Sequence, residues 1–242
     1  TQRKNLTSKN MFCRRNMQNQ RTEILIGENG VKTLSQKSVL VVGVGGVGGY
    51  VCEMLARCGV GRLTLVDFDK VDITNINRQI VALHSTVGQN KVEAIKTRIH
   101  DINPNIEVTA ICQKISSENI EKILSKKFDF VVDAIDDVEN KILLIKTCQD
   151  KGLKLVCALG SGNRFVIPKF EVVDISKTEN DGLAKKIRLG LRRLGINHQT
   201  VVYSKQDRVK TDTTTIGSIS YFPAMCGCVI AGFVINSLLE EK

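Results

Sequence analysis

The chain has 242 residues, of which 42% are hydrophobic and 25% are charged. A chain of this length and composition can bury a core large enough for a single soluble domain without disulfides or structural metal ions. The eight cysteines are scattered, and none forms a CxxC pair. This excludes a zinc site of the usual spacing, and we expect reduced, buried thiols instead.

Much of the formal net charge of +10 lies in two segments. Residues 1–22 hold six basic residues and no acidic residue, which predicts a flexible basic arm. Residues 183–210 hold eight basic residues and one acidic residue, for a net charge of +7. Such clusters are typical of proteins that bind nucleic acid, although a solvated basic surface accounts for the charge alone slightly better.

The two ends of the chain bear on its location. No secretory signal is visible at the start, so we expect a cytoplasmic protein. The basic, acid-free start is also typical of a transit peptide, which leaves an organellar location as the alternative. The apolar run 219–239 is interrupted by Pro223, Gly227 and Gly232. We therefore predict a buried helix over 222–239 and no membrane span.

After the arm, the pattern predicts one domain over residues 23–242 that begins with a short helix over 23–36. Apolar runs of strand length then alternate with segments whose apolar residues recur at helical spacing. The expected strands span 38–43, 63–67, 108–112, 130–136 and 154–160, and the expected helices lie within 43–60 and over 88–102, 117–126 and 139–151. This alternation predicts a Rossmann-like, doubly wound α/β fold with a mostly parallel sheet and helices on both faces.

Beyond residue 160 the alternation loosens. The segments 170–175 and 201–204 are typical of two further strands, which we expect to be antiparallel. Between them, residues 183–194 place leucine and isoleucine on one helical face and basic residues on the other. We predict that 183–210 is a basic insertion near the C-terminal end of the domain.

A glycine-rich motif, Gly43-x-Gly45-x-x-Gly48, joins the first expected strand to a helix, with Gly46 inside it. Glycine permits the tight turn and the close approach of backbone to phosphate, and a helix N-terminus favours negative charge. Asp67 follows at the end of the second expected strand, where a carboxylate can accept hydrogen bonds from ribose hydroxyls. The motif indicates a nucleotide, and by itself it does not distinguish NAD from ATP.

Four further residues favour ATP. Asn75, Arg78 and Lys91 lie just past the ends of the first strands. An enzyme that releases pyrophosphate uses such cations to hold the β and γ phosphates, whereas a nicotinamide enzyme has no need of two. Asp136, at the end of the fourth expected strand, can hold a magnesium ion among the phosphates. Each residue alone is typical of a surface ion pair, but together they predict an ATP and Mg²⁺ site with catalytic roles for Arg78, Lys91 and Asp136.

The segments GVGGVGG, LVDFDxVxxxNxNRQ, TVGQxK, INP and DAID resemble the ThiF/MoeB branch of the ubiquitin-activating enzyme superfamily, over roughly residues 20–165. The resemblance implies carboxylate adenylation, with ATP bound by the glycine loop and Asp67 on its ribose. It implies Asn75, Arg78 and Lys91 at the phosphates and Asp136 at magnesium. It also implies a homodimer in which an N-terminal arginine reaches the partner's triphosphate, and Arg21 fits that arginine.

The last third of the chain resembles the tRNA threonylcarbamoyladenosine dehydratase subgroup, in the segments 160–196 and 218–235. Members adenylate the threonine carboxylate of a modified adenosine in tRNA, and the side chain then cyclises. A basic helix suits a tRNA backbone, where binding is mostly electrostatic. The tRNA contacts that we expect are Arg164, Lys185, Lys186, Arg188, Arg192 and Arg193.

Three alternatives are weighed against this interpretation. The first is an adenylyltransferase for a ubiquitin-like or sulfur-carrier protein, which would make a carrier or sulfur-transfer protein the partner. Members that form a thioester need a cysteine in the crossover segment, and none lies between Cys157 and Cys226. The second, a Rossmann oxidoreductase, leaves Asn75, Arg78 and Lys91 unexplained. The third is a non-catalytic nucleic-acid-binding protein. Such a protein would not need the residues of the nucleotide site, and this chain retains them.

Overall fold

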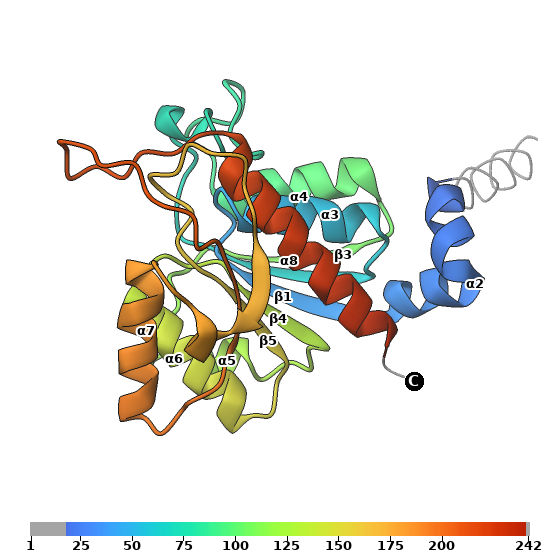
Figure 1. Cartoon of the computed structure of the whole chain (residues 1–242). Helices are drawn as coiled ribbons and strands as arrows, with labels where there is room; N and C mark the ends of the chain where they lie inside the picture. Colours follow the sequence, from blue (N-terminus) through green and yellow to red (C-terminus); the bar gives the residue numbers. More distant parts are fainter. Residues whose placement is uncertain (1–17, 241–242) are drawn as a thin grey trace, which may run out of the picture.

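The protein, seen in a computed structural model that describes residues 18–240, is built on one seven-stranded sheet (Figure 1). The strand order is β3-β2-β1-β4-β5-β7-β6, and all neighbouring pairs are parallel except β6 with β7. The strands are β1 (Ser38–Val42), β2 (Arg62–Val66), β3 (Glu107–Ile111), β4 (Phe130–Asp133), β5 (Leu155–Ala158), β6 (Glu171–Asp174) and β7 (Thr200–Tyr203). The predicted mostly parallel α/β fold is confirmed.

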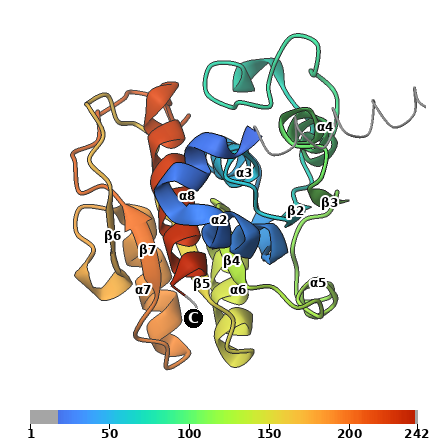
Figure 2. The same cartoon turned by 90° about the vertical axis from the view of Figure 1, so that its right-hand side faces the viewer.

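Helices cover both faces of the sheet (Figures 1 and 2). One face is packed by α3, α4 and α8, and the other by α5, α6 and α7. The helices are α2 (Gln20–Gln36), α3 (Gly48–Arg57), α4 (Lys91–Ile102), α5 (Ile120–Ile123), α6 (Val138–Asp150), α7 (Gly182–Arg193) and α8 (Tyr221–Leu239), with two short 3₁₀ helices, η1 (Ile73–Asn75) and η2 (Ile175–Lys177). Two separate apolar cores result, one on each side.

The central strand β1 shows how the sequence produces this arrangement. All five of its residues are buried. Val39 and Val41 point into one core, and Leu40 and Val42 into the other, because successive side chains of a strand point to opposite faces. A continuous apolar run is therefore what a strand covered on both faces requires.

The apolar run near the C-terminus forms α8, which has a mean hydropathy of 1.9 and is long and apolar enough to cross a membrane. It lies instead against α3 and the sheet, as Figures 1 and 2 show. The approach to α3 is close, since a side chain at Gly227 would meet the carbonyl oxygen of Val47 at 2.5 Å. The hydropathy of α8 is that of a helix which packs on the core.

The predicted basic insertion at 183–210 needs correction. Strand β7 lies within it, is parallel to β5 and antiparallel to β6, and buries Val201 and Val202 completely. The expected antiparallel pair of strands is present, but it extends the main sheet. The segment is therefore part of the fold, and its positive charge is carried by α7 and the loops.

Several boundaries differ from the sequence-based expectations. Helix α2 begins at Gln20, within the predicted arm, and is kinked at Gly27, whose φ is 74°; residues 1–17 of that arm lie outside the described part. The helix expected over 117–126 is the single turn α5. The strand expected over 130–136 ends at Asp133, because the Asp133 carboxylate accepts the N–H of Ile135 and turns the chain.

Candidate active site

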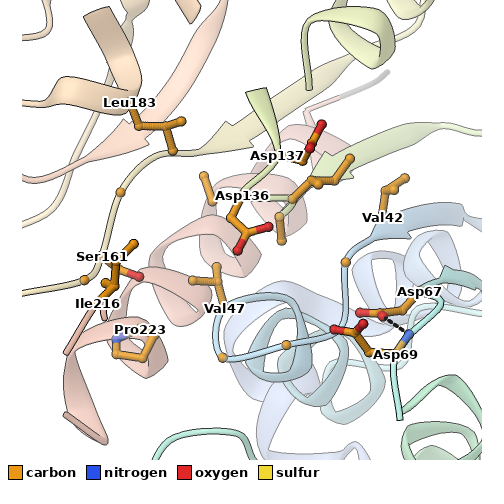
Figure 3. Close-up of a pocket in the computed structure, with 18 of the residues that line it drawn as sticks. Val42, Val47, Asp67, Asp69, Asp136, Asp137, Ser161, Leu183, Ile216 and Pro223 are labelled. Atoms are coloured by element: carbon orange, nitrogen blue, oxygen red, sulfur yellow. Dashed lines mark hydrogen bonds between the residues drawn. The ribbon is translucent and has the colours of Figure 1, made fainter. Parts of the chain in front are cut away.

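A cavity of about 840 Å³ opens at the carboxyl ends of β1, β2, β4 and β5 (Figure 3). In the close-up, Asp67 and Asp69 lie on one side of Asp136, and Ser161 and Ile216 on the other. We call the side with the glycine loop and Asp67 the nucleotide half. The other side, bounded by residues 160–163, the start of α7 and residues 208–218, is the acceptor half.

The glycine loop forms the floor of the nucleotide half. Gly43 has a φ of 87°, and a side chain there would meet the carbonyl oxygen of Ala134 at 2.7 Å. A side chain at Gly48 would overlap the carbonyl oxygen of Gly43. Gly45 and Gly46 line the cavity itself. Gly43 and Gly48 allow the turn to form, and Gly45 and Gly46 leave the backbone of the loop open to a ligand.

Asp67 ties this loop to the end of β2. Its Oδ2 accepts the N–H of Val44 at 2.8 Å, and its Oδ1 accepts the N–H of Asp69 at 2.9 Å. Each carboxylate oxygen has a second lone pair. The same side chain can therefore fix the loop and still accept a hydroxyl that enters the cavity.

The polar residues expected at the phosphates reach the cavity from two elements. Asn75 ends η1, where its amide oxygen accepts the N–H of Asp72 at 3.1 Å in a capping box. Arg78 follows, and one of its terminal nitrogens donates to the carbonyl oxygen of Thr74 at 2.9 Å. Both residues line the cavity, and Asn75 is buried.

Lys91 enters from the first turn of α4. Its Nζ lies 2.8 Å from a carboxylate oxygen of Asp69, and the residue is only 5% exposed. Asp69 is two residues beyond Asp67, so the chain segment that ends β2 presents one carboxylate to the loop and another to the lysine. The pairing holds the ammonium group at the cavity wall.

Asp136 sits in the turn between β4 and α6 and points into the middle of the cavity (Figure 3). Two contacts fix this turn. Below it, Asp133 pairs with Lys141 of α6 at 2.7 Å, and neither side chain is exposed. After it, the carboxylate of Asp137 accepts the N–H of Asn140 and caps α6.

Only the donor set around Asp136 bears on the magnesium prediction. Among the described residues, no three His, Cys, Asp or Glu side chains are grouped as a metal site. Magnesium typically binds through one or two carboxylates together with substrate phosphates and water. An exposed carboxylate at this position fits an ion that arrives with a triphosphate.

Gln79 is a cavity residue that sequence reasoning missed. It is 7% exposed, and its Oε1 has no hydrogen-bond partner among the residues that the structure describes. Its side-chain nitrogen lies on the Gly45 side, 3.7 Å from where a side chain at Gly45 would begin. A buried amide without a partner costs free energy unless a ligand supplies one. The signal in the sequence was its place directly after Arg78 in the order Asn-x-Asn-Arg-Gln.

Arg164, predicted to contact tRNA, is 2% exposed and lies inside the protein. Its guanidinium donates to the carbonyl oxygens of Gly160, Gln206 and Ser204, and lies 3.4 Å from the buried carboxylate of Asp181. Desolvation lowers the pKa of this guanidinium, although the Asp181 charge opposes the shift. In this position Arg164 supports the acceptor half and is not available to a nucleic acid.

The basic residues of α7 are of two kinds, exposed ones and one that turns back onto the protein. Lys185, Lys186, Arg192 and Arg193 are exposed. Arg188 instead turns back and donates to the Thr178 hydroxyl at 2.6 Å and to the carbonyl oxygen of Ile175. A nucleic-acid surface on α7 can therefore use the first four, while Arg188 holds η2 against the helix.

Arg21 does not line the cavity of its own chain. It is exposed near the start of α2, which stands at the side of the molecule in Figure 1. The neighbouring Ile24 and Leu25 are 78% and 85% exposed. Arg21 is therefore not brought together with the other predicted site residues within one chain.

Seven of the eight cysteines lie in the described part of the chain, and all seven are free thiols. Cys52, Cys148, Cys157 and Cys226 are buried. Burial raises the pKa of Cys148 and of Cys226 to about 12, which makes them poor nucleophiles at neutral pH.

Residues 17–242 match the model of the ThiF family. The chain belongs to that family. The match extends over both halves of the cavity, so the acceptor half is part of the ThiF domain as well as the nucleotide half.

Two of three similar proteins align over nearly the whole chain, and the third aligns over half of it. A tRNA threonylcarbamoyladenosine dehydratase from Bacillus subtilis is 40% identical over 239 residues, which are 91% of this chain and 94% of the relative. Structures of the E. coli tRNA N6-threonylcarbamoyladenosine dehydratase TcdA, in complex with AMP and with ATP, give TM-scores of 0.86 and 0.85 at 33% identity, over 90% of this chain and 92% of theirs. The adenylyltransferase and sulfurtransferase MOCS3 of Culex quinquefasciatus is 40% identical over 123 residues, which are 51% of this chain and 28% of that protein.

Proposed function

We propose that this ThiF-family chain is an ATP-dependent enzyme that dehydrates threonylcarbamoyladenosine in tRNA, acting in the cytoplasm. One observation carries the proposal. The cavity joins a glycine loop, two cationic side chains and the exposed Asp136 carboxylate at one sheet edge, in a chain similar to such dehydratases along almost its entire length. The similarity to MOCS3, by comparison, covers only 51% of this chain.

In the proposed complex, ATP occupies the nucleotide half. Asp67 accepts a ribose hydroxyl, and the backbone of the glycine loop meets the phosphates. Asn75, Arg78 and Lys91 then lie at the triphosphate. The two cations offset the negative charge that grows on pyrophosphate as it leaves. A magnesium ion bound at Asp136 would supply Lewis-acid stabilisation of the same phosphates.

The proposed reaction has two steps. In the first, a carboxylate oxygen of the substrate attacks the α-phosphorus of ATP, the bond to the β-phosphate breaks, and pyrophosphate leaves. In the second, a nucleophilic atom of the same side chain attacks the activated carbonyl carbon, AMP leaves and a ring closes. The nucleoside has then lost one water overall. No protein nucleophile is required, because positioning and electrostatic stabilisation can supply the rate.

The proposed tRNA surface is the exposed basic face of α7. Lys185, Lys186, Arg192 and Arg193 lie on this helix, whose N-terminal residues Gly182 and Leu183 line the acceptor half. Phosphates along this face would be held mainly by charge. A tRNA bound there can direct a modified nucleoside into the cavity.

We also propose a homodimer in which Arg21 acts on the partner's triphosphate. The support is the position of Arg21 outside its own cavity, next to the exposed Ile24 and Leu25. Exposed apolar residues on a helix at the side of a domain are typical of an interface. Mixing an Arg21→Ala dimer with an Asp136→Ala dimer should then restore part of the activity, since one site in each mixed dimer has both groups. A mixture without any recovery would contradict action between subunits.

The direct test is AMP release from ATP and magnesium, with and without tRNA that carries threonylcarbamoyladenosine, followed by mass analysis of the nucleoside. We expect release that depends on the modified tRNA, together with loss of one water from the nucleoside. Unmodified tRNA is the matched control. Release without any change in nucleoside mass would contradict the proposal.

The second candidate is adenylation of the C-terminus of a ubiquitin-like or sulfur-carrier protein. The similarity to MOCS3 over half of the chain favours it. ATP binding that does not respond to modified tRNA would favour this candidate too. The next assay would then be ATP–pyrophosphate exchange with small proteins that end in Gly-Gly.

A further inference from the structure

Three charged residues form a cluster beside the acceptor half. The carboxylate of Asp181 is buried and lies 3.4 Å from a nitrogen of Arg164 and 3.6 Å from a nitrogen of Arg208. Its other oxygen accepts the N–H of Ala184 and caps α7. One carboxylate thus serves two guanidinium groups, so the cluster carries an excess positive charge.

The two arginines of this cluster are placed differently. The Arg164 side chain is fully buried, with its nitrogens used by backbone carbonyls. The Arg208 side chain is 40% exposed and lines the cavity. The excess charge is therefore accessible at Arg208, which can accept an anion while Asp181 keeps it in place.

Lys186 adds a second cation at the same place. It lies one turn after the cap of α7, is exposed, and lines the cavity from that side. Its neighbour Lys185 is equally exposed but does not line the cavity. Lys186 thus joins the cavity to the basic face of α7, because it belongs to both.

We propose that Arg208 and Lys186 form a phosphate subsite that holds the RNA backbone next to the nucleoside entering the acceptor half. The inference rests on the proposed function. It adds a site for one specific part of the substrate, where Arg208 favours an RNA over the free nucleoside.

Position distinguishes this phosphate from the reacting carboxylate. The carboxylate has to reach the α-phosphate of ATP beside the glycine loop. Arg208 is held at Asp181, and Asp181 directly precedes Gly182 and Leu183 in the chain. Leu183 lies on the far side of Asp136 from Asp67 (Figure 3). The anion bound at Arg208 is thus at the end of the cavity that opens toward α7, where a backbone phosphate would continue along the helix.

The test compares substrates with and without phosphate. AMP release is measured with the modified nucleoside alone, with a short RNA that carries it, and with tRNA, for wild type and for Arg208→Gln, Arg208→Lys, Lys186→Gln and Lys185→Gln. ATP affinity is measured for each variant by calorimetry. Lys185→Gln is the matched control, because it removes the same charge from the adjacent helical position outside the cavity.

For Arg208→Gln and Lys186→Gln we expect KM for the short RNA and for tRNA to rise about tenfold, as for loss of a charged hydrogen bond. The slope of log KM against log salt concentration should fall by about 1, as expected for the loss of one phosphate contact. ATP affinity and turnover of the nucleoside should stay at wild-type values. Arg208→Lys should recover part of the loss, and Lys185→Gln should change the short-RNA KM less than Lys186→Gln does.

Two results would overturn the subsite. An equal loss with nucleoside and with RNA would mean that Arg208 holds the carboxylate or supports the fold. Unchanged KM values in both variants would mean that neither side chain meets a phosphate. Failure of the proposed function would be seen separately, in the wild-type protein. If no modified RNA stimulates AMP release by wild type, the proposed function is wrong, and the subsite, which rests on it, is wrong as well.

Discussion

The two halves of the cavity are held by different kinds of contact. In the nucleotide half, the glycine loop follows the buried strand β1, and its backbone is bonded to Asp67 at the end of the neighbouring strand β2. In the acceptor half, residues 160–164 and 204–208 are irregular chain, and the side chain of Arg164 joins them. One half is supported by the sheet, and the other by a buried ion cluster.

The two halves should therefore respond separately to mutation. Contacts made by backbone and sheet are shared by many residues, so a single side chain seldom decides them. A buried arginine that donates to three carbonyls and pairs with a carboxylate is a single point of support, because its loss removes a donor from each carbonyl and the buried cation from Asp181. Four substitutions test that separation, and their expected effects decrease in the order given.

Asp136→Ala should have the largest effect on activity. It should leave both the sheet contacts of the nucleotide half and the ion cluster of the acceptor half unchanged. We expect AMP release to fall about a thousandfold, since the proposed metal no longer stabilises the phosphates. The protein should still fold, because Asp136 is exposed and Asp133 and Asp137 hold the turn. An AMP-release assay and a thermal melt measure the activity and the stability of the variant. Glu139→Ala, at an exposed position outside the cavity, is the control.

Arg164→Met should break the acceptor half alone. We expect the free energy of unfolding to fall by about 3 kcal/mol, because Asp181 loses its buried partner. ATP affinity should remain unchanged, since the glycine loop and Asp67 make no bond to this cluster. Urea denaturation and calorimetry with ATP measure these effects. A parallel loss of ATP affinity would show that the halves are coupled.

Gly45→Ala should disturb only the nucleotide half. The nearest atom to the new methyl group would be 3.7 Å away, on Gln79, so the fold accommodates it. The methyl group would nevertheless occupy space where phosphate meets the backbone, and we expect ATP affinity to fall about tenfold. Gly232→Ala, a helical position with nothing within 4 Å, is the control. Normal ATP affinity in Gly45→Ala would place the phosphates elsewhere.

Glu53→Gln should have the smallest effect and should touch neither half. Burial alone would raise the pKa of Glu53, but hydrogen bonds from Arg98 and Arg57 lower it below its usual value. A carboxyl with a lowered pKa adds stability above its unfolded pKa, and this stability is lost as the pH falls through the folded value. We expect a loss of about 1 kcal/mol at pH 7, which shrinks below about pH 4. A difference that stays constant with pH would contradict the ionic role.

The nucleotide half could be predicted because its determinants are close together in sequence. The order of strand, Gly43-x-Gly45-x-x-Gly48, helix, strand and Asp67 dictates both the turn and the place of the carboxylate. Parallel strands end at the same edge, so the pattern alone also brings Asp136 to the cavity. The apolar alternation likewise determined the α/β fold.

The acceptor half depends on contacts between segments that are far apart in the sequence. Arg164 and Arg188 have the same charge as the exposed Lys185 and Lys186. The sequence does not reveal that both turn inward, Arg164 to the carbonyl oxygen of Ser204 and Arg188 to that of Thr178. Arg208 lines the cavity beside the buried carboxylate of Asp181, which lies 27 positions earlier in the sequence. Local patterns determine turns and strands, whereas the partner of a long side chain depends on how distant segments come together.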